Sequence, residues 1–228
     1  MIARPPVWVV ELAARFWATA GDPPPFPRDL RSVLPWLQSV HVIEVPHLTL
    51  ATASQQFARH NVPCRPSTED RPLAGCFGGR RGVGVILFDP TLDPTELRFT
   101  LAHEVAHYLR DYDAPRRRVA SRLGERALEV LDDLRPATVN ERFAGVLREV
   151  SLACHTHFLD RDRRGRVPNG AAREAEDAAD RLAFELLAPF DAVASGTRPD
   201  AATLISRLVS HFGLPTSEAA KYTAVLIR

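Results

Sequence analysis

Residues 98–109 of this 228-residue chain, Arg98-Phe99-Thr100-Leu101-Ala102-His103-Glu104-Val105-Ala106-His107-Tyr108-Leu109, carry its most informative pattern. They contain His-Glu-x-x-His. Residues four apart lie on one face of a helix, so the imidazoles of His103 and His107 can both reach one ion. Glu104 lies about 100° further round the helix axis, close enough to act on a water molecule at that ion. The pattern therefore predicts a helix with two ligands and the general base of a catalytic zinc site.

The residues before this stretch predict where the helix begins. Asp93 can cap it, Pro94 suits its first turn, and Glu96 completes a capping pattern with Asp93. Apolar residues occupy more than one side of the helix: Leu97, Leu101, Val105, Tyr108 and Leu109. We therefore expect it to be buried, with polar partners for its His and Glu side chains, because burying an unpaired charge is costly. The alternative is a chance match, in which these polar side chains are satisfied by hydrogen bonds alone.

Catalytic zinc usually has three protein ligands, so a third is expected elsewhere in the chain. Residues 173–189 carry a second helical pattern. On one face of it, Glu176 and Asp180 lie one turn apart, and the small Ala183 would allow close packing on the first helix. Glu176 can then bind the metal, while Asp180 accepts a hydrogen bond from the far ring nitrogen of a metal-bound histidine. The alternative is a solvated acidic face.

Together the two patterns resemble a known family. Residues 99–109 are similar to the metal-site helix of the ImmA/IrrE family of metallopeptidases. Residues 176–189 resemble the second signature of that family, in which Asn or Asp follows the metal-binding Glu by four positions. The resemblance extends over residues 30–110 and 170–226. The chain departs from the family in residues 111–173, because the connection between the two motifs is much shorter in typical members.

The resemblance implies a function and a set of site residues. It implies a zincin-like hydrolase in which His103, His107 and Glu176 bind Zn²⁺ and Glu104 is catalytic. The implied substrate is a protein, often a helix-turn-helix repressor whose cleavage turns on phage, mobile-element or stress genes. The residue that stabilises the oxyanion stays open among five candidates: Tyr108, Tyr112, His155, His157 and His211.

The composition of the chain argues against several other classes of protein. An apolar fraction of 45% suits a globular core, and a net charge of +1 argues against nucleic acid as an obligatory partner. No apolar run reaches the length of a membrane span. The three cysteines, Cys64, Cys76 and Cys154, are an odd number without Cys-x-x-Cys spacing, which suits a reduced cytoplasm. We expect one cytoplasmic domain over residues 1–228, with no membrane partner and with its oligomeric state open.

The first half of the chain predicts an α+β fold that is mostly helical, with a small antiparallel sheet. Helices are expected over Val7–Ala20, 29–38 and 51–59, and strands over 40–45, Leu73–Phe77 and Val83–Phe88, with a turn at 78–82. The last strand directly precedes the metal helix. Zinc peptidases with His-Glu-x-x-His commonly hold the substrate backbone against a strand in that place. We therefore expect Val83, Val85 and Leu87 to lie along bound substrate.

The second half predicts two helical additions. Residues 111–173 carry a helical pattern over 116–134, a second helix from the capping box at Thr138 to Val150, and a polar loop over 160–170. This insertion is open to three roles: a lid, a docking surface or an inert addition. Residues 200–228 resemble a helix-turn-helix. The start of its second helix lacks base-contacting residues, so direct DNA binding is not favoured.

The sequence therefore predicts a zinc-dependent endopeptidase. Two other classes remain open. A regulatory protein would keep the metal as a structural element and dock a partner through the insertion, although such a site does not need Glu104. A DNA-binding regulator would bind duplex DNA tightly in a salt-sensitive manner. The true substrate and the physiological metal are not readable from the sequence.

Overall fold

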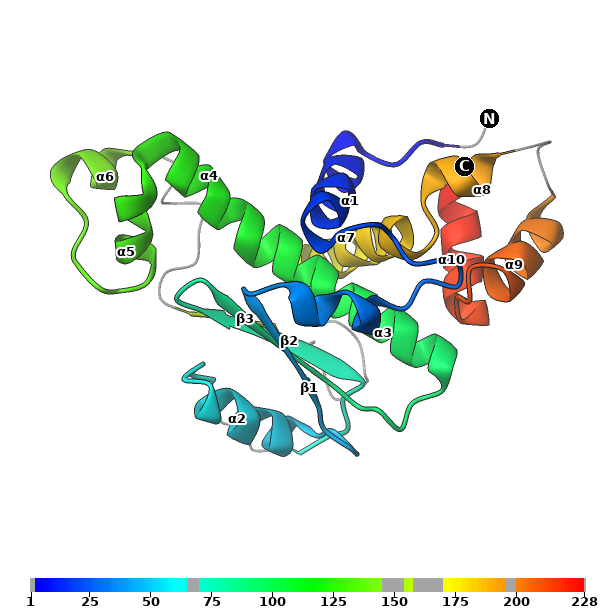
Figure 1. The fold of residues 1–228 in the computed structure, drawn as a ribbon, viewed down its shortest axis with the longest axis horizontal. Helices are drawn as coiled ribbons and strands as arrows, with labels where there is room; N and C mark the ends of the chain where they lie inside the picture. The colour runs from blue at the N-terminus through cyan, green and yellow to red at the C-terminus, as the bar shows by residue number, and fades with distance from the viewer. Residues whose placement is uncertain (1–2, 65–69, 145–153, 158–169, 196–199, 228) are drawn as a thin grey trace.

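The computed structural model describes residues 3–64, 70–144, 154–157, 170–195 and 200–227 (Figure 1). The fold is α+β and mostly helical, as expected. The longer helices are α1 (Val7–Ala20), α2 (Leu50–Arg59), α3 (Pro94–His107), α4 (Ala114–Leu123), α7 (Gly170–Leu187), α9 (Ala201–Ser210) and α10 (Thr216–Leu226). The short helices are α5 (Leu128–Leu131), α6 (Val139–Phe143) and α8 (Phe190–Ala194). The helix expected over 29–38 is instead two 3-10 turns, because Pro35 lacks the N–H that a continuous helix would use.

The sheet is mixed, so the prediction of an antiparallel sheet is wrong for one pair of strands. Its strands β1 (Val40–Glu44), β2 (Gly75–Arg80), β3 (Val83–Phe88) and β4 (Cys154–His157) lie in the order β1-β3-β2-β4. The hairpin β2–β3 and the pair β2–β4 are antiparallel, whereas β1 runs parallel to β3. A parallel pair needs a long crossover, and here α2 and β2 provide it. The edge strand β4 was not predicted.

The two faces of the sheet carry different helices, with α3 on one face and α2 on the other (Figure 1). Side chains alternate between these faces along each strand. Phe77, Ile86 and Phe88 belong to the main core together with α3, α7 and the C-terminal helices. Val85 and Leu87 belong to a second core under α2. The sheet therefore separates α3, the helix that carries His-Glu-x-x-His, from α2.

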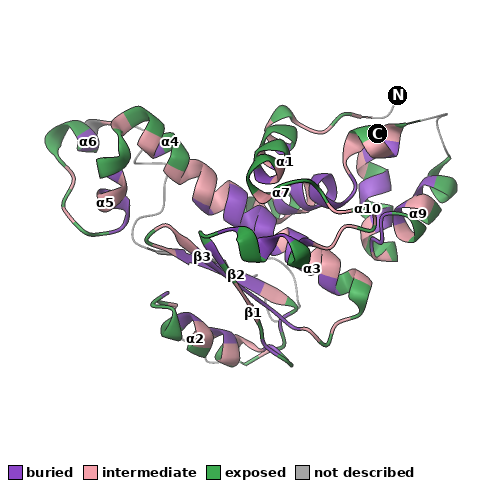
Figure 2. Cartoon of the chain, in the orientation of Figure 1, coloured by how far each residue is buried: buried purple, intermediate pink, exposed green. Residues whose placement is uncertain are grey.

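The metal helix is longer than its motif. From α3 the helix continues through a π-helical segment, Tyr108–Asp113, into α4, and it ends at Gly124, whose φ is 84°. The helix predicted over 116–134 is therefore a continuation of α3, followed by short turns. Figure 2 shows that the middle of this long helix is buried and that its ends are exposed. The capping box predicted at Thr138 is confirmed in α6, while the continuation to Val150 lies outside the described residues.

The second metal-motif helix, α7, packs against α3 and α1. Ala183 is fully buried, in keeping with the close approach expected at that position. The C-terminal helices join the same core: the ring of Tyr222 stacks on Phe184 at 4.5 Å, and its hydroxyl donates to the carbonyl of Ala188 at 3.2 Å. Within the described residues, no helix combines the length and apolar character that a membrane span requires.

Candidate metal centre

Three predicted ligands from two helices meet at one point. His103 and His107 lie one turn apart on α3, and Glu176 faces them from α7. The Nε2 atoms of the histidines are 3.1 Å apart. The carboxylate oxygens of Glu176 lie 3.3 Å from Nε2 of His103 and 3.5 Å from Nε2 of His107.

These distances fit a tetrahedral metal ion. Zinc bonds to nitrogen and oxygen are about 2.0–2.2 Å long, so two ligand atoms of a zinc tetrahedron lie about 3.3–3.5 Å apart. The three measured separations of 3.1, 3.3 and 3.5 Å lie close to that range. Two imidazoles and one carboxylate also form a donor set typical of catalytic zinc, which leaves a fourth position for water or substrate. The residues present therefore fit zinc in both geometry and chemistry.

Both histidines are oriented by a carboxylate on the far side of the ring. The Nδ1 atom of His103 lies 2.9 Å from Oδ1 of Asp180, which confirms the predicted contact. The Nδ1 atom of His107 lies 2.8 Å from Oδ2 of Asp111. Ionised carboxylates only accept, so both Nδ1 atoms donate, and the Nε2 atom of each ring is the one left for a metal ion. The two Nε2 atoms face each other, so a cation between them, either a proton or a metal ion, stabilises this arrangement.

Sequence reasoning missed Asp111. The signal was its spacing, because Asp111 follows His107 by four residues and four-residue spacing places side chains on one helix face. Asp111 lies in the π-helical segment and also pairs with Nη1 of Arg110 at 3.0 Å. Short π-helical segments are rare and frequently occur at functional sites.

The electrostatics of the centre favour positive charge. Burial alone lowers the pKa of His103, but hydrogen bonds to Asp180 and Glu176, with the nearby charge of Glu104, outweigh burial and raise that pKa to about 10. The same carboxylates that stabilise an added proton also stabilise a divalent cation.

The candidate metal centre opens into a cleft of about 470 Å³. His103, Glu104 and Glu176 line it from the two helices, and Leu73, Ala74 and Gly75 line it from the segment that leads into β2. Glu104 is only 6% exposed, as expected for the buried helix. At Gly75 the backbone passes so close to α3 that an added Cβ would lie 2.7 Å from Cγ2 of Thr100 and 3.0 Å from Cγ of Glu104. The strand and the proposed base are therefore in direct contact.

The prediction that Val83–Phe88 is an exposed substrate-binding strand is wrong. This strand, β3, is hydrogen-bonded to β1 on one side and to β2 on the other, so its backbone has no free edge. Val85 and Leu87 are also buried under α2, on the opposite face from the metal helix, and Val83 lies on that same side by alternation. The sequence placed the strand next to the metal helix but could not show which strand lies at the edge.

The unpaired backbone edge that was expected at β3 lies instead at the start of β2. The carbonyl of Ala74 accepts from the N–H of Asp89 on the β3 side, so by alternation the N–H and C=O of Gly75 point to the other edge. There, β4 pairs only with Phe77–Arg80. Among the described residues, Gly75 thus has an unpaired strand edge beside the predicted metal ligands.

None of the three oxyanion candidates with described side chains lines the cleft. The hydroxyl of Tyr108 is hydrogen-bonded to Ser39, and the hydroxyl of Tyr112 accepts from the N–H of Gly82. His211 packs on Phe26, with ring centroids 5.3 Å apart. His155 and His157 lie on β4, and their side chains lie outside the described structure.

The described helices of the insertion, α4, α5 and α6, do not line the cleft either. Figure 1 shows them extending away from the region where α3 crosses α7. In the structure described these helices therefore do not cover the cleft, and the loop predicted over 160–170 lies outside the described residues.

Comparison with known proteins adds no relative from which a function could be inferred: no family model, curated protein or solved structure matches the chain.

Proposed function

We propose that the chain is a zinc-dependent endopeptidase. The observation that carries this proposal is the set of three ligand atoms 3.1–3.5 Å apart, in which each histidine is held by a carboxylate behind it. A purely structural zinc site is usually closed by four protein ligands, often cysteines. Here two of the three ligands, His103 and Glu176, line an open cleft, and Glu104, next to the first histidine, lines it with them.

When bound, zinc polarises the scissile carbonyl and makes water acidic enough to lose a proton near neutral pH. Glu104 accepts that proton as general base and then donates it to the leaving amine. Its burial beside Gly75 keeps the carboxylate in one place. Asp180 and Asp111 keep both imidazoles in the tautomer whose Nε2 is free to bind the metal.

The substrate backbone pairs with the edge of β2 at Gly75, as an added strand. Main-chain hydrogen bonds of this kind place little demand on the substrate sequence. They also orient an extended peptide along the cleft, with its scissile bond next to the metal. An extended substrate suits cleavage within a chain rather than at its end.

The substrate is a protein, and a helix-turn-helix repressor is the class that the ImmA/IrrE resemblance suggests. A repressor encoded next to this gene is the first one to test. The C-terminal helices α9 and α10 serve the enzyme as part of its core, since Leu204, Leu208 and Leu226 are buried there.

A peptide library analysed by mass spectrometry tests the activity even while the substrate is unidentified. The library is incubated with zinc-loaded protein, with protein stripped by a chelator, and with stripped protein after zinc is restored. Cleavage is expected in the first and third samples only. Cleavage that survives chelation, or no cleavage in any sample, contradicts the proposal.

A further inference from the structure

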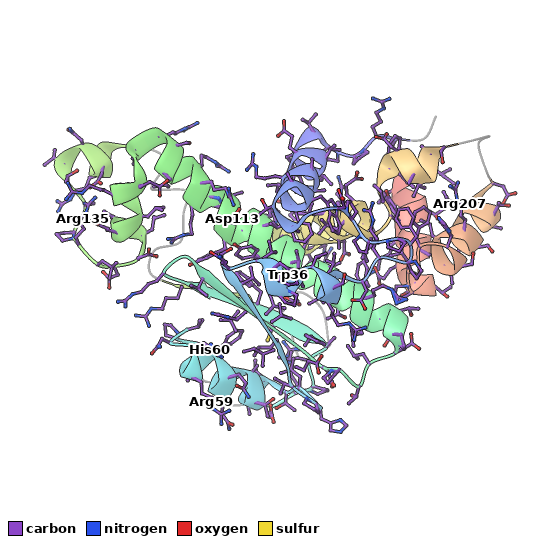
Figure 3. All side chains as sticks on the ribbon, viewed as in Figure 1. Trp36, Arg59, His60, Asp113, Arg135 and Arg207 are labelled. Atoms are coloured by element: carbon purple, nitrogen blue, oxygen red, sulfur yellow. The ribbon has the colours of Figure 1, made fainter. Side chains whose placement is uncertain are left out.

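A second cavity lies on the face of the sheet opposite the metal centre. It has a volume of about 550 Å³ and lies between the end of α2, the turn of the β2–β3 hairpin and the start of β1. We call it the basic pocket and define it by five side chains: His41, Arg59, His60, Arg80 and Arg81. Figure 3 labels Arg59 and His60 at the end of α2, below the hairpin. The rest of its lining is three valines and Asn61.

The charged side chains that line this pocket are all positive. Three arginines line it, and none of the described residues that line it is acidic. Within the described part of the chain, neither Arg59 nor Arg81 forms an ion pair with a carboxylate, whereas Arg116 and Arg135 elsewhere do. The C-terminus of α2 adds a partial negative charge, equivalent to about half an elementary charge. Three guanidinium groups outweigh it.

Contacts across the pocket join the elements that form it. Nη1 of Arg80 donates to the carbonyl of Asn61 at 2.6 Å, which ties the hairpin to the end of α2. A guanidinium has five N–H donors, so four remain on Arg80 for a ligand. The rings of His41 and His60 lie 5.8 Å apart, so strand β1 and helix α2 present their imidazoles together.

Arg81 occupies a backbone position that arginine rarely takes. Its φ is 49° and that of Gly82 is 83°, so both central residues of the two-residue hairpin turn are left-handed. Such turns favour Asn, Asp or Gly at the first position. Arginine there is less favourable for the backbone, but it places a third cation at the mouth of the pocket.

We propose that the basic pocket binds a small molecule that carries two or more phosphate groups. Guanidinium groups bind phosphate oxygens in pairs of parallel hydrogen bonds, and three of them match more than one phosphate. The volume lies within the range of about 300–1,000 Å³ typical of small-molecule sites. A concave pocket fits a compact ligand better than a duplex, and the net charge of +1 leaves no large excess of positive charge for nucleic acid.

Calorimetric titration with inorganic pyrophosphate tests the proposal on the zinc-loaded protein. We expect saturable binding of one pyrophosphate that the double variant R59Q/R81Q weakens about 10–100-fold, as expected for the loss of charge-assisted hydrogen bonds. R122Q/R126Q is the matched control, because it removes the same charge from exposed positions outside the pocket. The control variant measures the effect of total charge alone, because nonspecific attraction depends only on total charge. We expect the pyrophosphate affinity of the control variant to stay within about twofold of wild type. Pyrophosphate that bound at the zinc ion would bind equally to all variants, so it would not produce a difference in affinity between R59Q/R81Q and R122Q/R126Q.

A single variant separates binding from folding. Arg81→Asn places a residue that tolerates left-handed backbone in the turn, so the melting temperature should stay the same or rise by about 1–4 °C. Pyrophosphate affinity should nevertheless fall. Unchanged affinity in Arg81→Asn, equal losses in the pocket and control variants, or no saturable binding would each overturn the proposal. Binding of duplex DNA that depends on Arg59 and Arg81, without pyrophosphate binding, would overturn it in favour of a nucleic-acid surface.

Discussion

The Nδ1 atom of His107 lies 2.8 Å from Oδ2 of Asp111, one turn further along the same helix. The helix therefore supplies both a proposed metal ligand and the carboxylate that orients it. Asp180 does the same for His103 from α7, at 2.9 Å. The two imidazoles are held independently, one from within its own helix and one from the facing helix.

The first prediction concerns Asp111. Asp111→Asn keeps the size of the side chain but removes its charge, so zinc affinity should fall roughly 10–100-fold, as expected when a carboxylate behind a ligating histidine is lost. Competition with a chromogenic chelator measures this affinity. Asp113→Asn is the matched control, because Asp113 lies in the same π-helical segment but pairs with Arg117. Equal losses in the two variants would mean that Asp111 acts only on the stability of the helix.

The second prediction assigns the third ligand. Glu174 and Glu176 lie on the same helix about 200° apart, so both cannot face the histidines. Glu176→Ala should lose most of the bound zinc, whereas Glu174→Ala should keep it, because Glu174 is exposed. Elemental analysis of the purified variants measures zinc per chain. If Glu174→Ala strips the metal and Glu176→Ala retains it, the assignment of the ligand is wrong.

The third prediction concerns the close approach of β2 to α3. Gly75→Ala places a Cβ 2.7 Å from Thr100 and 3.0 Å from Glu104, so the strand, Thr100 or Glu104 must shift. We expect a loss of about 1–3 kcal/mol in the free energy of unfolding. The rate of peptide cleavage per folded molecule should also fall, while zinc stays bound. Gly170→Ala is the control, since no atom of the described residues lies within 4 Å of its added Cβ. Full activity in Gly75→Ala would mean that neither this edge nor the position of Glu104 matters for cleavage.

The fourth prediction tests the position of β3. Leu87 is fully buried under α2, away from the cleft. Leu87→Ala should lower the free energy of unfolding by about 2–5 kcal/mol, as large-to-small substitutions in a core do. The KM for peptide, measured on the folded fraction, should not change. A raised KM at unchanged kcat would return β3 to the substrate-binding role that its sequence position suggested.

The sequence predicted the parts of the site that depend on local periodicity. His103 and His107 lie one turn apart on α3, and Glu176 and Asp180 lie one turn apart on α7. The close contact between these two helices brings the four side chains together. The capping residue Asp93 was predicted for the same reason, although its side chain accepts from the N–H of Thr95 rather than forming a box with Glu96. Local spacing is a reliable guide because it depends only on the 3.6-residue repeat of the helix.

The sequence could not predict which strand lies at the edge of the sheet. The apolar run Val83–Phe88 suits a buried central strand as well as an edge strand beside the metal. Its place between β1 and β2 depends on the parallel pairing of β1 with β3, a contact between residues 40–44 and 84–88 that no local pattern encodes. Gly78 and Gly79 suggested a turn, whereas in β2 they allow the aromatic rings of Phe57 and Tyr112 to approach the strand closely.

A substitution at Glu104 is the sharpest test of the proposed peptidase activity. Glu104→Gln keeps the shape of the side chain and both histidines but removes the general base. Zinc content, measured by elemental analysis, should stay near that of wild type, while cleavage of a peptide identified from the library should fall by about 10²–10⁴-fold. Unchanged cleavage with zinc still bound would contradict the proposal that this centre is the active site of a peptidase.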